Sequence, residues 1–393
     1  MKPPLVASEN DEELAFLLQQ RDKEMAVGRY SRPFGTELIV GMFCQPIFAV
    51  PKKGGTNEKK FRLVNDHSAG SPSINSLIPP EGGSVHLDNL IDLACCLRVT
   101  ISHAGCIPAY LFKSDASQAY RRIPMHPLWQ ARQPVRFDGL LHVDHNAVFG
   151  NRASGKLWCT FFALVGWAAV HKRGVEDLHQ YVDDNFGFDF ERQLVYYPPY
   201  KTSYPKKQVL LLELWDEIGL LHEKPKQVFG AVLEIIGLEV SLISMTISMS
   251  LDRRLELVAV VCQFVSPDSQ RAFPLGDWLS ILGWMNWALN AYPLLKPALQ
   301  PAYDKIRGKS VSHAPVYRNK DIVSHFMWFA DRVEKSPGVH FIEMTEWGPE
   351  NADCRLYCDT SSQALGFWSP QHNTSFISPL VNDSNTIFFK RCA

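Results

Sequence analysis

The sequence predicts a globular protein of the α+β class, and three observations support this. Apolar residues make up 46% of the 393 residues and charged residues 21%, the composition of a folded protein with a large core. Short apolar runs interrupted by Pro and Gly fill the chain up to about residue 250, as expected for strands and turns. Beyond Ser250 apolar residues recur about every 3.6 positions, which indicates helices.

The elements can be assigned in order along the chain. Residues 1–30 read as a short acidic helix with a loose end. Residues 153–173 are apolar nearly all round and predict a buried helix. Further helices are expected at 208–218, 255–265, 278–289 and 293–306. Strands or strand hairpins are expected at 46–50, 61–64, 110–114, 178–190, 231–242 and 354–368, with a protruding turn at Gly54-Gly55.

Charge and hydropathy restrict the partners. The net charge is −1, so a basic surface for nucleic acid must be local, and the clusters at 52–62 and 113–136 are the candidates. The longest apolar run, 157–170, is too short to span a bilayer, and the acidic N-terminus lacks the apolar core of a signal peptide. We therefore expect an intracellular protein of the cytoplasm or nucleus, with no membrane partner.

Carboxylates form the central chemical signal. Asp183 and Asp184 lie at the turn of the hairpin expected at 178–190, and Asp115 ends an apolar strand. Adjacent ionised carboxylates repel each other, and a bound divalent cation reverses this effect. Carboxylate oxygens are ligands that Mg²⁺ prefers, and two such ions can support an in-line displacement. The sequence thus predicts a catalytic Mg²⁺ or Mn²⁺ site at these residues. The simpler alternatives are a surface turn for the pair and a helix N-cap for Asp115.

These motifs resemble those of a known family. Asp115 followed by Ala119-Tyr120 resembles the first palm motif of reverse transcriptases, and Tyr181-Val182-Asp183-Asp184 resembles their YxDD box. The resemblance is closest to retroelements of the DIRS and Ty3 kinds, and its blocks run in the family's order from about 34 to 368. It implies a right-hand polymerase fold of fingers, palm and thumb, which makes DNA from dNTPs on an RNA or DNA template with a primer.

The resemblance also implies a division of the chain. Residues 1–33 would be an N-terminal acidic helix or tail, 34–248 the interleaved fingers and palm, and 249–310 the helical thumb and connection. Residues 311–393 would be a linker and a truncated ribonuclease H-like segment, with a partial hairpin that contains Asp359. Only Asp383 follows Asp359 among acidic residues, so ribonuclease H activity is not expected.

Nucleotide contacts follow from the same resemblance, for Lys53, Arg62, Tyr120, Phe149, Gly150 and Lys226. Lys53 and Arg62 would contact the triphosphate, with Lys52 as the alternative to Lys53, and Lys226 would lie near the pyrophosphate. Phe149 and Gly150 would support the incoming base. Tyr120 would lie beneath the sugar, although a buried core aromatic is the alternative for this residue. Arg121 and Arg122 would lie along the template path. The family's usual Pro is missing after Ser154, and Arg152 has no assigned role.

Two other interpretations of the whole chain remain open. A retroelement relic that binds nucleic acid without polymerising it would keep the same fold. A metal-dependent phosphohydrolase could use the same carboxylates. Release of pyrophosphate rather than monophosphate from a dNTP separates polymerase from phosphohydrolase. The oligomeric state is unknown from the sequence.

Overall fold

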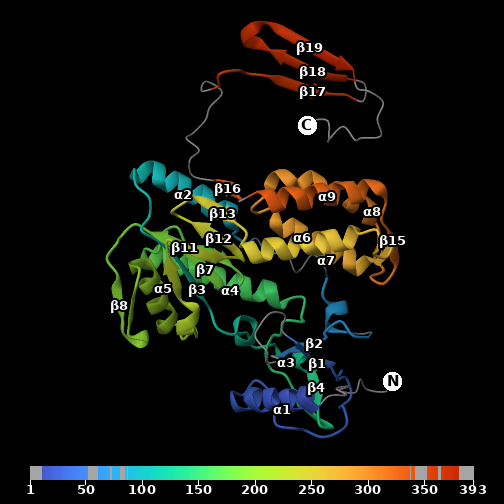
Figure 1. Ribbon diagram of the computed structural model, residues 1–393. Helices are drawn as coiled ribbons and strands as arrows, with labels where there is room; N and C mark the ends of the chain where they lie inside the picture. Colours follow the sequence, from blue (N-terminus) through green and yellow to red (C-terminus); the bar gives the residue numbers. More distant parts are fainter. Residues whose placement is uncertain are drawn as a thin grey trace. The chain divides into compact units, whose positions relative to one another are not determined.

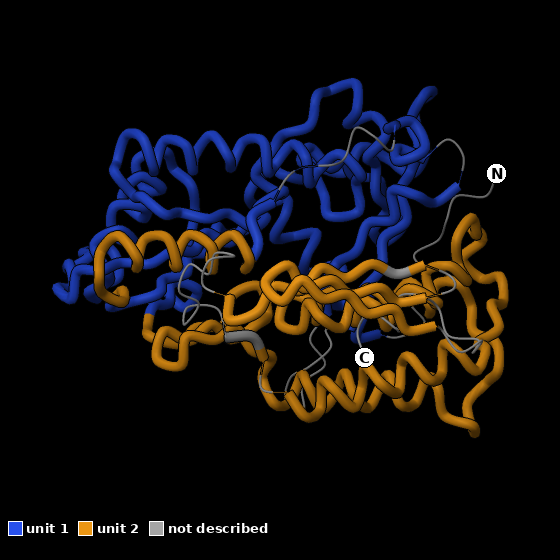
Figure 2. Tube along the Cα trace, turned by 90° about the horizontal axis from the view of Figure 1, so that it is seen from above, with its two compact units in different colours: residues 1–89, 109–229 blue, residues 90–108, 230–393 orange. Residues whose placement is uncertain are grey.

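The structure is a computed structural model that describes residues 11–51, 61–70, 73–79, 85, 87–336, 338–340, 352–361 and 364–379 (Figure 1). The chain forms two compact units that are both discontinuous in sequence (Figure 2). Unit 1 comprises residues 1–89 and 109–229, and unit 2 comprises residues 90–108 and 230–393.

Unit 1 contains a mixture of short strands and helices. Its elements are α1 (Asp11–Ala26), β1 (Ile47–Pro51), β2 (Phe61–Asn65), η1 (Ile74–Leu77), β3 (Tyr110–Asp115), η3 (Ala119–Arg122), α3 (Pro127–Gln130), β4 (Pro134–Phe137), β5 (Leu140–Val143), α4 (Ser154–Arg173), β6 (His179–Tyr181), β7 (Asp184–Asp189), β8 (Val195–Tyr197), η4 (Pro198–Tyr200), β9 (Thr202–Tyr204), α5 (Lys206–Glu217), η5 (Lys224–Lys226) and β10 (Val228–Gly230).

A four-stranded sheet in the order β10–β3–β7–β6 forms the centre of unit 1. Strands β3 and β7 pair antiparallel along their whole lengths, and β6 continues the sheet beyond β7. Helices α4 and α5 pack on this sheet and on each other. The shared core is aromatic and aliphatic because both helices turn large side chains toward β3, and it includes Phe112, Trp158, Phe162, Val165, Leu211, Leu212 and Trp215.

Helix α4 corrects one prediction. The helix itself is confirmed, but the expectation that it is buried all round is wrong, because Leu164 is 63% exposed and Trp167 is 50% exposed. The buried side is formed by Trp158, Phe162 and Val165, which recur at helical spacing. An apolar helix can therefore still have side chains that the described residues leave exposed.

The remaining part of unit 1 joins α1 to two antiparallel strand pairs, β1–β2 and β4–β5. A small core holds them together, in which Leu17 of α1 and Tyr30 pack with Ile47, Val135 and Phe137. The acidic helix predicted near the N-terminus is thus confirmed as α1, and it packs on the sheet strands. The turn predicted at Gly54-Gly55 lies outside the described residues.

The described residues of unit 2 are mainly helical and form three small sheets. Its elements are α2 (Leu90–Ala104), β11 (Val232–Ile235), β12 (Leu238–Ser241), β13 (Thr246–Ser248), α6 (Leu251–Val265), β14 (Ala272–Pro274), α7 (Leu275–Ala288), η6 (Pro293–Leu299), α8 (Gln300–Ile306), β15 (Pro315–Tyr317), α9 (Lys320–Lys335), β16 (Val339–His340), β17 (Tyr357–Thr360), β18 (Ala364–Ser369), η8 (Pro370–His372) and β19 (Thr374–Pro379).

The helices predicted after Ser250 are confirmed as α6, α7 and the η6–α8 pair, whereas α2, α9 and β19 were not predicted. The strand β19 turns the expected hairpin near the C-terminus into a three-stranded antiparallel sheet, β17–β18–β19. None of the described helices combines the length and the apolar character that crossing a bilayer requires.

Candidate active site

The central sheet brings the predicted carboxylates to one edge of unit 1. The register of β3 and β7 places Asp115 directly opposite Asp184, and Asp183 belongs to the turn between β6 and β7. The backbone N–H of Ala116 donates to the carbonyl oxygen of Asp183 at 2.9 Å, which ties the turn to the end of β3. Asp115 and Asp184, 69 positions apart in the sequence, are therefore neighbours because the two strands pair to their ends.

The turn between β6 and β7 has an unusual backbone. Val182 has a φ of 55°, in the left-handed region that β-branched residues rarely adopt. The indole N–H of Trp158, in the buried face of α4, donates to the carbonyl oxygen of Val182 at 2.7 Å. Such a conformation persists only where surrounding structure holds it, and such residues cluster at functional sites. Helix α4 thus fixes the position of the Asp183-Asp184 pair.

The electrostatics show that the carboxylates crowd one another. Burial raises the pKa of Asp184 to about 6. The positive charge of Lys113 acts to lower this pKa, whereas the negative charges of Asp183 and Asp115 act to raise it further. Burial and the charge of Asp115 also raise the pKa of Asp183. A bound cation would relieve this repulsion, because it stabilises the ionised form of each carboxylate.

Two lysines lie beside the carboxylates. The ammonium Nζ of Lys226, in η5, donates to Asp115 Oδ1 at 2.7 Å. Burial opposes the charged form of Lys226, but this hydrogen bond and the charge of Asp115 raise its pKa above the ordinary value. Lys113 Nζ lies 4.0 Å from Asp184 Oδ2. The sequence interpretation missed Lys113, although the period of two in a strand places it on the same face as Asp115.

The donor set fits a hard cation that also binds a substrate. In the described part of the chain, no three acidic, imidazole or thiol side chains form a group that could hold a metal ion by themselves. Mg²⁺ is commonly bound by one or two carboxylates together with substrate phosphates and water, so a complete protein cage is not required. Asp115, Asp183 and Asp184 supply oxygen ligands of that kind.

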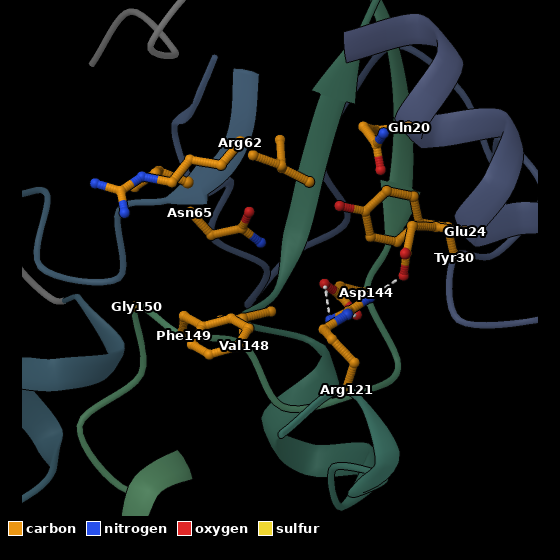
Figure 3. A pocket seen from close by; sticks show the side chains of 12 residues that line it. Gln20, Glu24, Tyr30, Arg62, Asn65, Arg121, Asp144, Val148, Phe149 and Gly150 are labelled. Atoms are coloured by element: carbon orange, nitrogen blue, oxygen red, sulfur yellow. Dashed lines mark hydrogen bonds and ion pairs between the residues drawn. The ribbon is translucent and has the colours of Figure 1, made fainter. Parts of the chain in front are cut away.

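The predicted nucleotide residues partly converge. The rings of Tyr120 and Phe149 lie 4.7 Å apart between centroids. Phe149 is 69% exposed, so most of its ring is free to contact a ligand. Phe149 and Gly150 line a cavity of about 500 Å³ together with Arg62 of β2 (Figure 3). Lys53 lies outside the described residues.

Gly150 has a steric reason for being glycine. A Cβ atom at this position would lie 2.0 Å from the carbonyl oxygen of Asn65, which ends β2. The amide of Asn75 further fixes this loop, because its Nδ2 donates to the carbonyl oxygen of Gly150 at 2.8 Å and its Oδ1 accepts from Arg152 N. Asn75 was not recognised in the sequence, where nothing distinguishes it from an ordinary loop residue.

The surroundings of three arginines bear on the predicted template path and on the loop after Gly150. The prediction that Arg121 lies along a template path is wrong, because its guanidinium is paired with Glu24 and Asp144 inside unit 1. Arg122 also has two buried guanidinium nitrogens, Nε and Nη2. Arg152, which had no assigned role, donates from Nη1 to the carbonyl oxygen of Ile78 at 2.7 Å. It therefore anchors the loop that follows Gly150.

Comparisons with known proteins show the fold. No family model and no curated protein matches the sequence. Among solved structures, the chain is similar to the foamy viral protease-reverse transcriptase dRH in complex with double-stranded DNA, at 15% identity and a TM-score of 0.57, over 97% of this chain and 58% of that chain. It is similar to the foamy viral enzyme in complex with an RNA/DNA hybrid, at 15% identity and a TM-score of 0.58, over 97% of this chain and 45% of that one.

A third structure, of the same foamy viral enzyme with double-stranded DNA, has 15% identity and a TM-score of 0.57, over 99% of this chain and 71% of that chain. These likenesses show that the chain has a reverse-transcriptase-like fold, as the sequence motifs predicted. The chain spans about half of the length of the first two structures.

Proposed function

We propose that the protein is an RNA-directed DNA polymerase of retrotransposon origin, of the DIRS- or Ty3-like kind. The observation that carries the proposal is the placement of Asp115 opposite Asp184, beside Asp183, on paired strands of a reverse-transcriptase-like fold. Its substrates would be dNTPs and a primer on an RNA or DNA template. In this proposal the fingers and palm occupy 34–248 and the helical thumb 249–310.

The carboxylates would hold the divalent cations, Mg²⁺ or Mn²⁺, whose chemistry when bound is to favour attack of a 3′-hydroxyl on a triphosphate. The protein's own contribution is positional. Trp158 and the Ala116 N–H fix the carboxylates at the strand ends. Lys226 supplies a positive charge at Asp115, where it would neutralise oxygens of the departing pyrophosphate.

The remaining residues would bind the nucleotide and template. Arg62, and Lys53 by the family resemblance, would neutralise phosphate charge. The exposed ring of Phe149 supports a stacking contact with a base, and Tyr120 packs behind it, where it would limit the space at the sugar. The glycine at 150 lets the chain approach β2 closely, which narrows the cavity around these contacts.

Ribonuclease H cleavage is not part of the proposal. Several carboxylates must converge for cleavage of the RNA strand by metal ions, and in this sequence only Asp383 follows Asp359. We assign residues 311–393 to a linker and a ribonuclease H-like segment that contains the β17–β18–β19 sheet.

Primer extension by the purified 393-residue chain tests the proposal. On a poly(rA) template with an oligo(dT) primer, dTTP and Mg²⁺, we expect extension that is lost by orders of magnitude in Asp115→Asn and Asp183→Asn. Asp138→Asn is the matched control, because Asp138 is an exposed turn residue whose left-handed φ of 46° also suits Asn.

The products separate the alternatives. Pyrophosphate release with primer growth supports the polymerase, whereas monophosphate release would identify a phosphohydrolase. A chain that binds the primer-template but does not extend it, with either cation, would be the nucleic-acid-binding relic. Near wild-type extension by Asp183→Asn would refute the assignment of the site.

A further inference from the structure

Arg121, the residue after Tyr120 in η3, belongs to a buried network of charged side chains with Glu24 and Asp144 (Figure 3). Arg121 Nη2 donates to Glu24 Oε2 at 2.6 Å, and Arg121 Nη1 donates to the Asp144 carboxylate oxygens at 2.9 and 2.8 Å. Glu24 also accepts from Arg29 Nε at 2.7 Å and from Arg29 Nη2 at 2.9 Å. The network therefore connects α1, η3 and the segment after β5.

These side chains have little access to solvent. The exposed fraction of the side chain is 13% for Arg121, 13% for Glu24 and 1% for Asp144. Burial raises the pKa of Asp144 to about 6, against the opposing charge of Arg121. Burial also acts to raise the pKa of Glu24, but the hydrogen bonds and charges of Arg29 and Arg121 hold it below the ordinary value. Removing one member would leave another charge buried without its partner, which proteins tolerate poorly.

The network holds both ends of the turn at 118–122. At the start, Arg29 Nη1 donates to Gln118 Oε1 at 2.5 Å, and Gln118 has a left-handed φ of 66°. At the end, Arg121 provides the ion pairs, and the Asn146 amide donates to the carbonyl oxygen of Arg121 at 3.1 Å. Tyr120 lies between these two fixed points, with its ring against Phe149.

Both Nη atoms of Arg121 are engaged by partners within unit 1. Its Nη1 is shared between Asp144 and the carbonyl oxygens of Asn146 and Ala147, at 3.5 and 3.3 Å, and its Nη2 bonds Glu24. The directions of these hydrogen bonds fix the orientation of η3, which an apolar side chain of equal volume would not do. The arrangement therefore suits a residue that orients its neighbour.

We propose that Arg121 is a positioning residue for Tyr120, and that Glu24 of α1 and Asp144 act through it. The network sets the position of the Tyr120 ring beneath the sugar of the incoming nucleotide. Helix α1 therefore takes part in the selection of dNTPs over rNTPs without touching the substrate. This inference rests on the proposed polymerase function for its substrate, and on the hydrogen bonds above for its geometry.

The first test is the ratio of kcat/KM for dTTP to that for UTP in primer extension. Arg121→Met should lower this ratio about tenfold, in the same direction as Tyr120→Ala, and Arg121→Lys should restore part of it because it keeps the charge. The double variant Arg121→Met/Tyr120→Ala should show no further change beyond Tyr120→Ala, since the effect passes through that ring. Arg173→Met, which removes an exposed ion pair with Glu217, should leave the ratio unchanged.

The second test does not need activity. Hydrogen exchange should accelerate in Arg121→Met at the amides of residues 121 and 123, which bond the carbonyl oxygens of Gln118 and Tyr120, but not at residue 218 of the same unit. If the wild-type chain does not extend primers, the proposed function is refuted. The change in hydrogen exchange at residues 121 and 123 would still test whether Arg121 holds η3, which carries Tyr120, in place. An unchanged dTTP/UTP ratio in an active variant, or exchange that rises equally throughout unit 1, would overturn the inference.

Discussion

Replacing Gly150 by Ala should destabilise unit 1 through one defined clash. The added Cβ would lie 2.0 Å from the carbonyl oxygen of Asn65 and 3.1 Å from its carbonyl carbon, and both atoms belong to the backbone. No side-chain rotation can relieve such a contact, so the loop must move away from β2 by about 1 Å. The movement also strains the 2.8 Å bond between the Asn75 amide and Gly150.

The magnitude follows from two opposing effects. Overpacking in a well-packed region costs about 1–3 kcal/mol, whereas Gly→Ala at a compatible position gains about 0.4–1 kcal/mol through the unfolded chain. With a 2.0 Å contact to backbone, the clash dominates, and we expect a net loss of about 2 kcal/mol in the free energy of unfolding. For a unit of this size that corresponds to a fall in Tm of about 4–8 °C.

Thermal unfolding followed by circular dichroism measures this effect. Gly155→Ala provides a matched control, because its Cβ would meet only the Tyr120 hydroxyl at 3.8 Å, an ordinary contact. Ala is also the better helix former in α4. If Gly150→Ala melts at the wild-type temperature, the close approach of this loop to β2 is not a feature of the folded protein, and the steric argument for the glycine fails.

Three further predictions concern other residues. Tyr120→Ala should raise incorporation of rNTPs relative to dNTPs in primer extension, and lower stability with an unchanged ratio would identify Tyr120 as a core aromatic instead. His67 should contribute a loss of about 3 kcal/mol in the free energy of unfolding as the pH drops from about 6.5 to 4, because burial lowers its pKa to about 4 and the unfolded chain binds the proton first. Urea titrations of the wild type and of His67→Gln isolate this contribution, since the difference between their free energies of unfolding should change by about that amount across the range. The 393-residue chain should not cleave the RNA of an RNA–DNA hybrid with Mg²⁺ or Mn²⁺, and cleavage that Asp359→Asn abolishes would contradict this expectation.

The sequence predicted the strands that carry the carboxylates because their signals are local. Phe186 and Phe188 alternate with polar or small residues directly after the Asp183-Asp184 pair, and both are fully buried in β7. That Asp115 lies beside this hairpin was predicted from the order of the family's motifs. The register of β3 and β7 confirms this position, because Asp115 pairs with Asp184.

Long-range partners explain what was missed. Arg121 lies in a basic cluster that suggests surface, yet it is paired with Glu24, 97 positions earlier, and Asp144, 23 positions later. No local pattern indicates such pairs. The close approach of Gly150 to Asn65 is hidden for the same reason, since a glycine gives no sign of which backbone lies against it.

The membership of α2 in unit 2 has a consequence for the order of folding during synthesis. Helix α2 emerges from the ribosome between two segments of unit 1, but the rest of its own unit begins at Gly230. At about 5–20 residues per second, the roughly 125 residues that follow Ala104 take about 6–25 seconds to appear. During that interval the apolar side chains of Leu90, Leu93 and Leu97, which are buried in the folded protein, lack most of their unit. A nascent chain paused before residue 230 would therefore expose this helix to chaperones.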